Sequence, residues 1–262
     1  MLVAAAAKHE DAEAVHDLRV SIRRFMQCLR EFQPFFGRKR ARNMRRRLRR
    51  VMNRCGRVRN HQIAMGLIEQ AGGHEPHTPA HLQSRLAEEQ DRLIEILIRW
   101  RQRRVRERWE RHLAPKDKPG GDWNLQQSAG ENAARILPGR AEALFAAGDQ
   151  AAAADAGYKK MHRFRLLAKH FRYTLEIFLP VYGDGIKSVM ADLRGLQDRL
   201  GVINDCVTAL KLLDGHPRAA VGVEGLLHQR EDEFRRFWVR RFGKAARARW
   251  VKKLGDTPGE KL

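Results

Sequence analysis

Apolar residues recur along most of this chain with the period of an α-helix, and no stretch alternates between apolar and polar residues as an exposed strand does. The pattern predicts helical segments over about 13–32, 39–70, 81–113, 124–147, 158–179, 184–213 and 219–250. Pro138 is expected to kink or split the fourth of these segments. Pro34 with Gly37, and Pro180 with Gly183, are expected to end the first and the fifth. The sequence therefore predicts an all-α fold.

Two of the predicted helices share an unusual pattern, in which a histidine and several cations accompany an apolar repeat. They contain VHDLRVSIRRFMQCLREF (15–32) and MHRFRLLAKHFRYTLEIF (161–178). At an offset of 146 residues the matching pairs are His16 with His162, Arg19 with Arg165, Arg23 with Lys169, Phe25 with Phe171 and Pro34 with Pro180. After the turn the offset is 145 residues, which aligns Arg42 with Lys187, Arg49 with Arg194 and Gly56 with Gly201.

Such matches arise either by duplication or by chance in an arginine-rich chain. The pairs include His, Phe, Pro and Gly, which are not abundant enough here to coincide often, so the pattern favours duplication. We therefore expect a first helical repeat over 1–113, a linker APKDKPGGD over 114–122 and a second repeat over 123–262, together forming one domain.

Each of the two matched helices combines an apolar seam with a flanking basic stripe. The seams are Val15, Leu18, Ile22, Phe25, Leu29 and Phe32 in the first helix, and Met161, Phe164, Ala168, Phe171, Leu175 and Phe178 in the second. The stripes are His16, Arg19, Arg23 and Arg30, then His162, Arg165, Lys169 and Arg172. The segment 39–70 adds Arg42, Arg45, Arg46 and Arg49 on one face. Like charges at this spacing repel, and a bound anion would cancel the repulsion.

The composition makes an anionic partner the leading interpretation of these stripes. The chain has 52 Lys and Arg against 31 Asp and Glu, a formal net charge of +21, and 39 of its cations are arginine. Arginine presents a planar fork that matches phosphate oxygens, although genomic base composition also enriches it. The alternatives are a solvated basic face and, for the two histidines, neutral side chains inside a bundle.

Little else in the sequence points to a compartment or a redox role. Cys28, Cys55 and Cys206 are an odd number without CxxC spacing, and Cys28 lies among core-type residues of its helix, so we interpret it as an inert packing residue. The opening MLVAAAAKHEDAE does not have the pattern of a signal peptide, and no stretch is apolar enough to span a membrane. We expect a soluble cytoplasmic protein.

The histidine-containing pattern resembles that of the CHAD family of helical domains. A hydrophobic residue, His, Arg, a second hydrophobic residue and Arg or Lys recur at the family's spacing at 15–23 and 161–169, and LGVIND (200–205) resembles a later family segment. The resemblance implies two four-helix bundles related by pseudo-twofold symmetry, with a basic groove or pore between them. It also implies binding of inorganic polyphosphate and association with polyphosphate granules.

The resemblance also assigns candidate polyphosphate-binding residues. They are His16, Arg19, Arg23, Arg42, Arg45, Arg49, His162, Arg165, Lys169, Arg172, Lys187 and Arg194. Asp205 occupies the family's acidic position, where we interpret it as orienting a histidine or an arginine. The first half departs from the family at Asn60 and Gln62, where aspartates are usual, so it is more cationic and its geometry is open to change.

Catalytic motifs are weak or absent in the sequence. EDEFR (231–235) lacks the final lysine of the Glu-x-Glu-x-Lys motif of the CYTH triphosphatases that accompany some family members, and it lies in a helical pattern. His74, His77 and His81 have metal-compatible spacing but belong to a proline-rich turn without a second cluster. No phosphate-binding loop or nucleophile elbow occurs. We therefore expect a protein that is not an enzyme and has no metal or cofactor.

The sequence thus predicts a non-catalytic polyphosphate-binding module. Its affinity is expected to fall by roughly 10³–10⁵ between 50 and 200 mM salt for six to ten phosphate contacts, by analogy with DNA. Protonation of the two histidines is expected to strengthen binding below neutral pH. A nucleic-acid binder using the same surface, with Trp100, Trp109 and Trp123 as stacking platforms, is the main alternative. A scaffold for acidic proteins is the third.

Overall fold

The structure, a computed structural model, describes residues 12–70, 77–103, 105–110, 113, 123–124, 126–213 and 217–256. These residues form helices joined by turns and short connections, and no strand occurs among them. The predicted all-α class is confirmed. The predicted linker 114–122 lies outside the described residues.

The chain divides into two compact units that are not contiguous in sequence. The first contains Met1–Gly120 and Asp205–Gly225, and the second contains Gly121–Asn204 and Leu226–Leu262. The helices α9 (Lys187–Leu212) and α10 (Pro217–Arg241) therefore each have one part in each unit. This division by contact differs from the predicted division into repeats, which remains a prediction.

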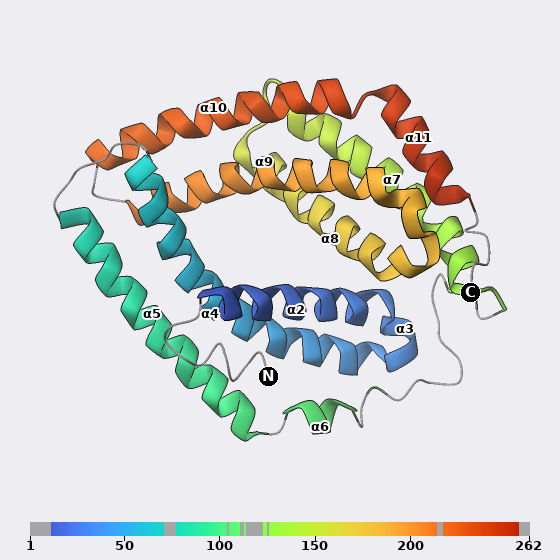
Figure 1. Cartoon of the computed structure of the whole chain (residues 1–262), viewed down its shortest axis with the longest axis horizontal. Helices are drawn as coiled ribbons and strands as arrows, with labels where there is room; N and C mark the ends of the chain where they lie inside the picture. The colour runs from blue at the N-terminus through green and yellow to red at the C-terminus, as the bar shows by residue number, and fades with distance from the viewer. Residues whose placement is uncertain are drawn as a thin grey trace. The chain divides into compact units, whose positions relative to one another are not determined.

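The first unit is built around α4 (Arg38–Gln70), which packs against α2 (Ala12–Glu31) and α5 (His77–Gln102) (Figure 1). Between α2 and α4 lies the single turn α3 (Gln33–Phe36), which ends at Gly37 with a positive φ of 82° that favours glycine. The short helix α6 (Val105–Glu110) follows α5, so the predicted segment 81–113 contains two helices.

The second unit contains α7 (Ala129–Ala152), α8 (Tyr158–Tyr182), the 3₁₀ turn η1 (Gly183–Ile186) and α11 (Lys244–Gly255), with parts of α9 and α10 (Figure 1). α7 packs against both α8 and α11. The predicted helix over 219–250 is interrupted at Gly243, whose extended backbone (φ −71°, ψ −179°) ends α10 and begins α11. η1 in turn begins at a Gly183 with φ 52°.

The predicted seams form the cores of the two units. In the first unit Leu18, Ile22 and Leu29 are buried, whereas Val15 and Phe25 are half-buried at the edge of the core. In the second unit all six predicted seam residues are buried among the aromatic rings of α7, α10 and α11. The burial leaves the basic stripes on the flanks of α2 and α8, where the helical period places them.

α7 begins later than the pattern predicts and is continuous through its proline. Ser128 caps the helix in a capping box, in which its hydroxyl accepts from the Glu131 amide and the Glu131 carboxylate accepts from the Ser128 amide. Asn124 lies before this cap, and its amide donates to Asn132 Oδ1 at 2.8 Å. Pro138 is inside the helix and does not split it.

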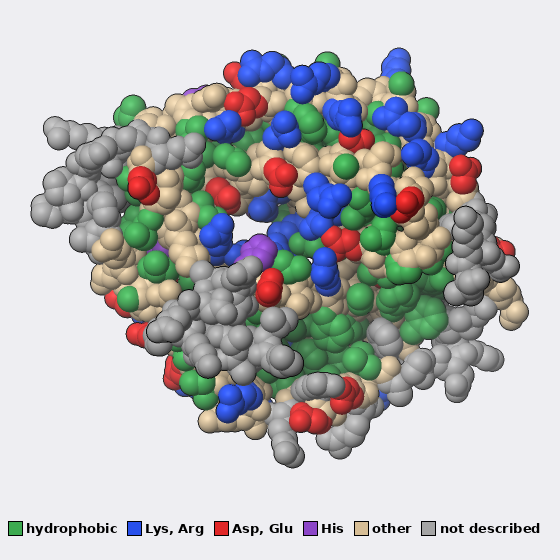
Figure 2. All heavy atoms as spheres, in the orientation of Figure 1, with side chains coloured by type: hydrophobic (Ala, Val, Ile, Leu, Met, Phe, Trp, Pro, Cys, Tyr) green, Lys and Arg blue, Asp and Glu red, His purple; other side chains and the backbone are tan. Residues whose placement is uncertain are grey.

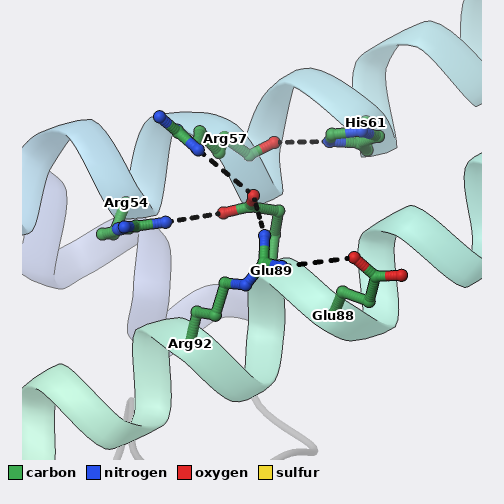
Figure 3. Close-up of polar contacts among 6 residues, drawn as sticks. All are labelled: Arg54, Arg57, His61, Glu88, Glu89 and Arg92. Atoms are coloured by element: carbon green, nitrogen blue, oxygen red, sulfur yellow. Dashed lines mark hydrogen bonds and ion pairs between the residues drawn. The ribbon is translucent and has the colours of Figure 1, made fainter.

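A buried carboxylate joins α4 to α5 in the first unit (Figure 3). Glu89, on α5, is 7% exposed and accepts from Arg92 at 2.9 Å and from Arg54 and Arg57 of α4 at 3.4 Å each. Burial alone would raise the pKa of Glu89, but the hydrogen bonds from Arg57 and Arg92 outweigh it and the pKa is lowered. Glu89 therefore holds arginines of two helices together and offsets their repulsion.

We predict that Gly148→Ala destabilises the second unit. A Cβ at position 148 of α7 would lie 2.0 Å from Cη2 of Trp238. Trp238 is stacked on Phe242 at 4.6 Å and donates from Nε1 to Asp149 at 2.9 Å, so its ring has little freedom to move. The overpacking should lower the free energy of unfolding by about 1–3 kcal/mol.

Denaturant unfolding of Gly148→Ala and of the control Gly139→Ala measures the effect. Gly139 belongs to the same helix, and nothing lies within 4 Å of the point that a Cβ would occupy there, so alanine should stabilise by up to about 1 kcal/mol. Equal stabilities of the two variants would contradict the packing described for Trp238.

We predict that Glu89→Gln loses stability in a pH-dependent manner. The pKa of Glu89 is lower in the folded chain than in the unfolded chain, so its ionised form stabilises the fold above the unfolded value of roughly 4.3. That contribution is lost as the pH falls through the folded pKa. Because the three arginines are 33–57% exposed, the difference at neutral pH should be only about 1 kcal/mol.

Urea unfolding of the wild type and Glu89→Gln at several pH values checks this sign. The control is Glu88→Gln, since the Glu88 side chain is 50% exposed and contacts Arg92 at 3.5 Å. A deficit in Glu89→Gln that persists unchanged well below pH 4 would show that the charge of Glu89 is not the cause.

Candidate functional site

The basic face of α2 combines exposed and half-buried cations. His16 is exposed, whereas Arg19 and Arg23 are half-buried one and two turns further along the helix. Arg23 donates from Nε to the backbone carbonyl of Arg19 at 3.2 Å, which draws its side chain back along the helix. The three predicted residues therefore share one face, as their spacing requires.

Arg19 is the most constrained cation of this face. Its Nε is buried and has no hydrogen-bond partner among the described residues. Burial lowers the pKa of Arg19, and the neighbouring charges of Arg23 and Arg59 lower it further, while Asp205 acts in the opposite direction. The fold thus keeps a partly desolvated guanidinium beside two others. We call Arg19, Arg23 and Arg59 the α2–α4 cluster.

The neighbouring thiol belongs to the packing of this cluster. Cys55 is fully buried, and burial raises its pKa to about 11 even though the positive charge of Arg19 favours the thiolate. A thiol with that pKa is protonated at neutral pH and is a poor nucleophile. Cys55 is a free cysteine in the structure.

A second group of like charges lies where the end of α2 faces the start of α4. Burial lowers the pKa of Arg45, and the charges of Arg30 and Arg49 lower it further. Arg45 is half-buried, while Arg42 and Arg49 are exposed on either side of it along α4. Of the predicted α4 residues, Arg45 therefore lies near a cation of α2, Arg30.

The histidine of the second unit, His162, differs in burial from His16, which is exposed. His162 of α8 is half-buried, and its Nδ1 lies 3.1 Å from the Tyr158 hydroxyl and 3.2 Å from Asn204 Oδ1. The Tyr158 hydroxyl also donates to Asn204 Oδ1, at 3.2 Å. An amide oxygen only accepts, so the short contact to Asn204 places a proton on Nδ1 of His162. We call these three residues the histidine triad.

Arg172 is held by several partners. Its Nε donates to Gln197 Oε1 at 2.7 Å, its Nη1 is paired with Glu176, and its guanidinium lies 4.7 Å from the centre of the Tyr173 ring. Gln197, from α9, in turn donates to the carbonyl of Ala168 at 3.1 Å. Of the predicted residues of the second unit, Arg172 therefore has the clearest structural role.

The other predicted residues of the second unit lie at different depths. Arg165 and Lys169 are half-buried on the same face of α8 as His162. Arg194 is exposed on α9, and Lys187 at the start of α9 is 71% exposed and pairs with Asp184 at 2.7 Å. Such an exposed pair contributes little to stability, so it leaves Lys187 able to exchange Asp184 for another anion.

The structure therefore gathers most of the predicted residues into sets within each unit. One face of α2 carries His16, Arg19 and Arg23, and one face of α4 carries Arg42, Arg45 and Arg49. One face of α8 carries His162, Arg165, Lys169 and Arg172. The groove or pore between two bundles remains a prediction, as does the internal duplication.

Sequence reasoning missed four residues that contact these sets. Arg59 lies about four turns beyond Arg45 on a similar face of α4, so helical spacing alone would have found it. Tyr158 precedes His162 by one turn. Asn204 and Gln197 belong to α9, and only the register between α8 and α9 determines that they meet His162 and Arg172.

Basic residues are not confined to the predicted faces. In the second unit Arg236, Arg240, Lys244, Arg249 and Lys252 are exposed. Figure 2 shows Lys and Arg side chains densely distributed over the C-terminal half of α10 and over α11. These residues are exposed surface charges, and they differ in this respect from the half-buried cations of α2 and α8.

The described residues offer no candidate for a metal site or a membrane span. Within the part of the chain that the structure describes, no three His, Cys, Asp or Glu side chains gather closely enough to hold a metal ion. His74, of the predicted histidine turn, lies outside the described residues. None of the described helices is long and apolar enough to cross a membrane.

Comparison with known proteins agrees with the helical fold and with the histidine pattern. The crystal structure of the CHAD domain from the plant Ricinus communis matches with a TM-score of 0.66 and 19% sequence identity, over 95% of this chain and 85% of that one. A search of curated proteins finds no match. The model of the CHAD domain family matches residues 2–214. This chain therefore belongs to the CHAD domain family.

Proposed function

We propose that this chain binds inorganic polyphosphate through the basic faces of α2, α4 and α8, without catalysing a reaction on it. The observation that supports this most strongly is the α2–α4 cluster, in which a half-buried Arg19 with an unpartnered Nε lies near two further guanidinium groups. Membership of the CHAD family supports the choice of polyphosphate, and association with polyphosphate granules would follow from that binding.

The chemistry of the cluster suits a chain of phosphates. Each guanidinium offers a planar fork to two oxygens of one phosphate, and charge-assisted hydrogen bonds of this kind are roughly twice as strong as neutral ones. Successive arginines along α2 and α4 meet successive phosphate units, so one flexible polyanion neutralises several cations. Asp205 remains a positioning residue because its carboxylate favours the charged form of Arg19.

In the histidine triad, the hydrogen bonds at Nδ1 make contact between His162 and an anion dependent on protonation. Asn204 Oδ1 and the Tyr158 hydroxyl occupy Nδ1 of His162, so only Nε2 remains for an anion. With the proton on Nδ1, Nε2 donates a hydrogen bond only when the imidazole is protonated. A hydrogen bond from His162 to a phosphate oxygen therefore requires the protonated imidazole.

A nucleic-acid binder using the same cations is the alternative that the composition favours. Against it, the aromatic rings of Trp100 and Trp109 pack against each other edge to face at 5.6 Å, and Trp123 stacks on Phe178 at 6.0 Å. Rings engaged in this way do not form an open platform for bases. We therefore favour polyphosphate.

We predict that Arg19→Met weakens polyphosphate binding roughly tenfold without lowering stability. The substitution keeps an unbranched side chain, shorter than that of arginine, and removes a half-buried charge that lies among other cations. The loss of repulsion should leave the unfolding midpoint unchanged or raise it. Isothermal titration with long-chain polyphosphate gives the affinity, and thermal unfolding without ligand gives the stability.

The matched control is Arg236→Met, at an exposed arginine of α10. An equal loss of affinity in both variants would indicate diffuse attraction to net charge. A less stable Arg19→Met chain with wild-type affinity would make Arg19 a structural residue. Duplex DNA that displaces polyphosphate at equal phosphate concentration would favour the alternative function, and the salt dependence of both ligands is measured in the same series.

We predict that polyphosphate binding takes up protons through His162. Between about pH 8 and pH 6, where histidine is the side chain that titrates, the affinity of the wild type should rise. In His162→Gln this increase in affinity should be smaller than in the wild type. The part of the increase that remains should come from His16. Titrations in buffers of different ionisation enthalpy count the protons directly.

His228→Gln is the control for this experiment, because His228 is an exposed histidine of α10 outside the proposed faces. An affinity that does not change with pH in the wild type would contradict the role of His162, though not the role of the arginines.

A further inference from the structure

The first unit contains a cavity of about 390 Å³ that none of the preceding functions uses. Four arginines line it, of which Arg47 and Arg50 come from α4, Arg99 comes from α5 and Arg103 follows α5 directly. Its remaining lining residues are Val51, Ile96, Trp100 and Val105. A cavity of this size is within the usual range for small-molecule sites.

A second cavity of about 370 Å³ adjoins the first and shares Val51, Trp100 and Val105 with it. Its walls come from α2, α4, α5 and α6 and are almost entirely apolar. The residues that line only this second cavity are Leu18, Ile22, Phe25, Leu48, Leu97, Trp109, Glu110 and Leu113. The two cavities therefore adjoin at Val51, Trp100 and Val105, and one has a basic lining whereas the other has an apolar lining.

The arginines of the first cavity are more exposed than the apolar residues that the two cavities share. All four arginines are exposed, whereas Val51 and Val105 at the junction of the cavities are 2% and 7% exposed. Arg99 is paired with Glu95, and both side chains are more than half exposed, so a ligand anion competes easily for that arginine. The arginines surround the mouth, and the apolar walls lie behind them.

This site is separate from the proposed polyphosphate-binding face of α4. At 3.6 residues per turn, Arg47 lies roughly opposite Arg42, Arg45 and Arg49, whereas Arg50 lies between these two sides of α4, about 80° from Arg42. They face α5, because Ile96, Arg99 and Trp100 line the same cavity. A polyphosphate has no apolar part, so it would gain nothing from the second cavity.

We infer that this site binds a single-chain amphipathic anion, with its head at the four arginines and its hydrocarbon chain in the apolar cavity. A carboxylate and a phosphate head both match the guanidinium fork, so a fatty acid and a lipid phosphate share the required chemistry. Glu110, at the apolar cavity, disfavours the reverse orientation because its carboxylate repels an anionic head. A nucleotide fits less well, since its ribose would leave polar groups against apolar walls.

The test titrates the full chain calorimetrically with three probes that share a twelve-carbon chain and are kept below their micellar concentrations. They are dodecanoate, dodecyl phosphate and dodecanol. We expect at least one of the anions to bind at least roughly tenfold more tightly than the alcohol, because only the anions reach the arginines. The two anions distinguish a fatty acid from a lipid phosphate. Inorganic phosphate alone should compete weakly.

Chain length and thermal stability supply independent readouts. From octanoate to dodecanoate the affinity should rise roughly fourfold for each added methylene that the apolar cavity buries. Binding to the folded chain should raise its unfolding midpoint, whereas detergent-like binding to the unfolded chain would lower it. A lowered midpoint, or an affinity independent of chain length, would overturn the inference.

The matched variants are Arg47→Gln/Arg50→Gln and Arg42→Gln/Arg49→Gln. Each removes two exposed arginines from α4, and only the first pair belongs to the lining of the basic cavity. The first pair should lower the affinity for the twelve-carbon anion roughly tenfold or more and leave the affinity for polyphosphate nearly unchanged. The second pair should lower the affinity for polyphosphate and leave the affinity for the twelve-carbon anion nearly unchanged. Three results would refute the site. They are dodecanol binding as tightly as both anions, no binding by either anion, and an equal loss of affinity for the twelve-carbon anion in both double variants. None of these results depends on polyphosphate binding, so the two proposals fail separately.

Discussion

Repulsion among guanidinium groups is the constraint to which the first unit is most clearly adapted. Two unit charges about 6 Å apart repel by roughly 3 kcal/mol at an effective dielectric constant of 20. Nevertheless α2 packs directly against α4, with Arg19 near Arg23 and Arg59, and Arg45 near Arg30 and Arg49. The apolar seam beside these cations must outweigh the repulsion, since burial of Leu18, Ile22 and Leu29 depends on the same approach of the two helices.

The two units relieve this repulsion in different ways. In the second unit neutral and acidic groups contact two of the predicted residues of α8, with Asn204 at His162, and Gln197 and Glu176 at Arg172. In the first unit the position that aligns with Asn204 in the predicted repeat is Arg59, which increases the positive charge near Arg19. The compensating carboxylate is displaced to the opposite side of α4, where Glu89 holds Arg54 and Arg57. A bound anion would therefore reduce the repulsion among cations more in the first unit than in the second.

The helical period predicted the fold well because both seams are regular, but it missed features that depend on contacts between helices. The apolar pattern continues through Val105 and Trp109, so α6 could not be separated from α5 by periodicity. Gly243 interrupts an otherwise continuous run between Trp238 and Trp250, and only the packing of both tryptophans around Phe145 requires the break. The basic stripes were predictable from one helix each, whereas Asn204 and Gln197 depend on the register of two.

The same reasoning distinguishes the two proposed anion sites of the first unit. In the α2–α4 cluster Arg19 is partly desolvated when the chain folds, so a polyanion that binds there would meet a donor that has already lost water and mobility. At the mouth of the cavity between α4 and α5 the arginines remain exposed, and their hydration must be displaced when a ligand binds. A head group alone gains little from such an exchange, and the additional free energy must come from apolar surface buried behind it. Depth of burial, more than number of charges, therefore separates a site for a purely ionic chain from a site for an amphipathic one.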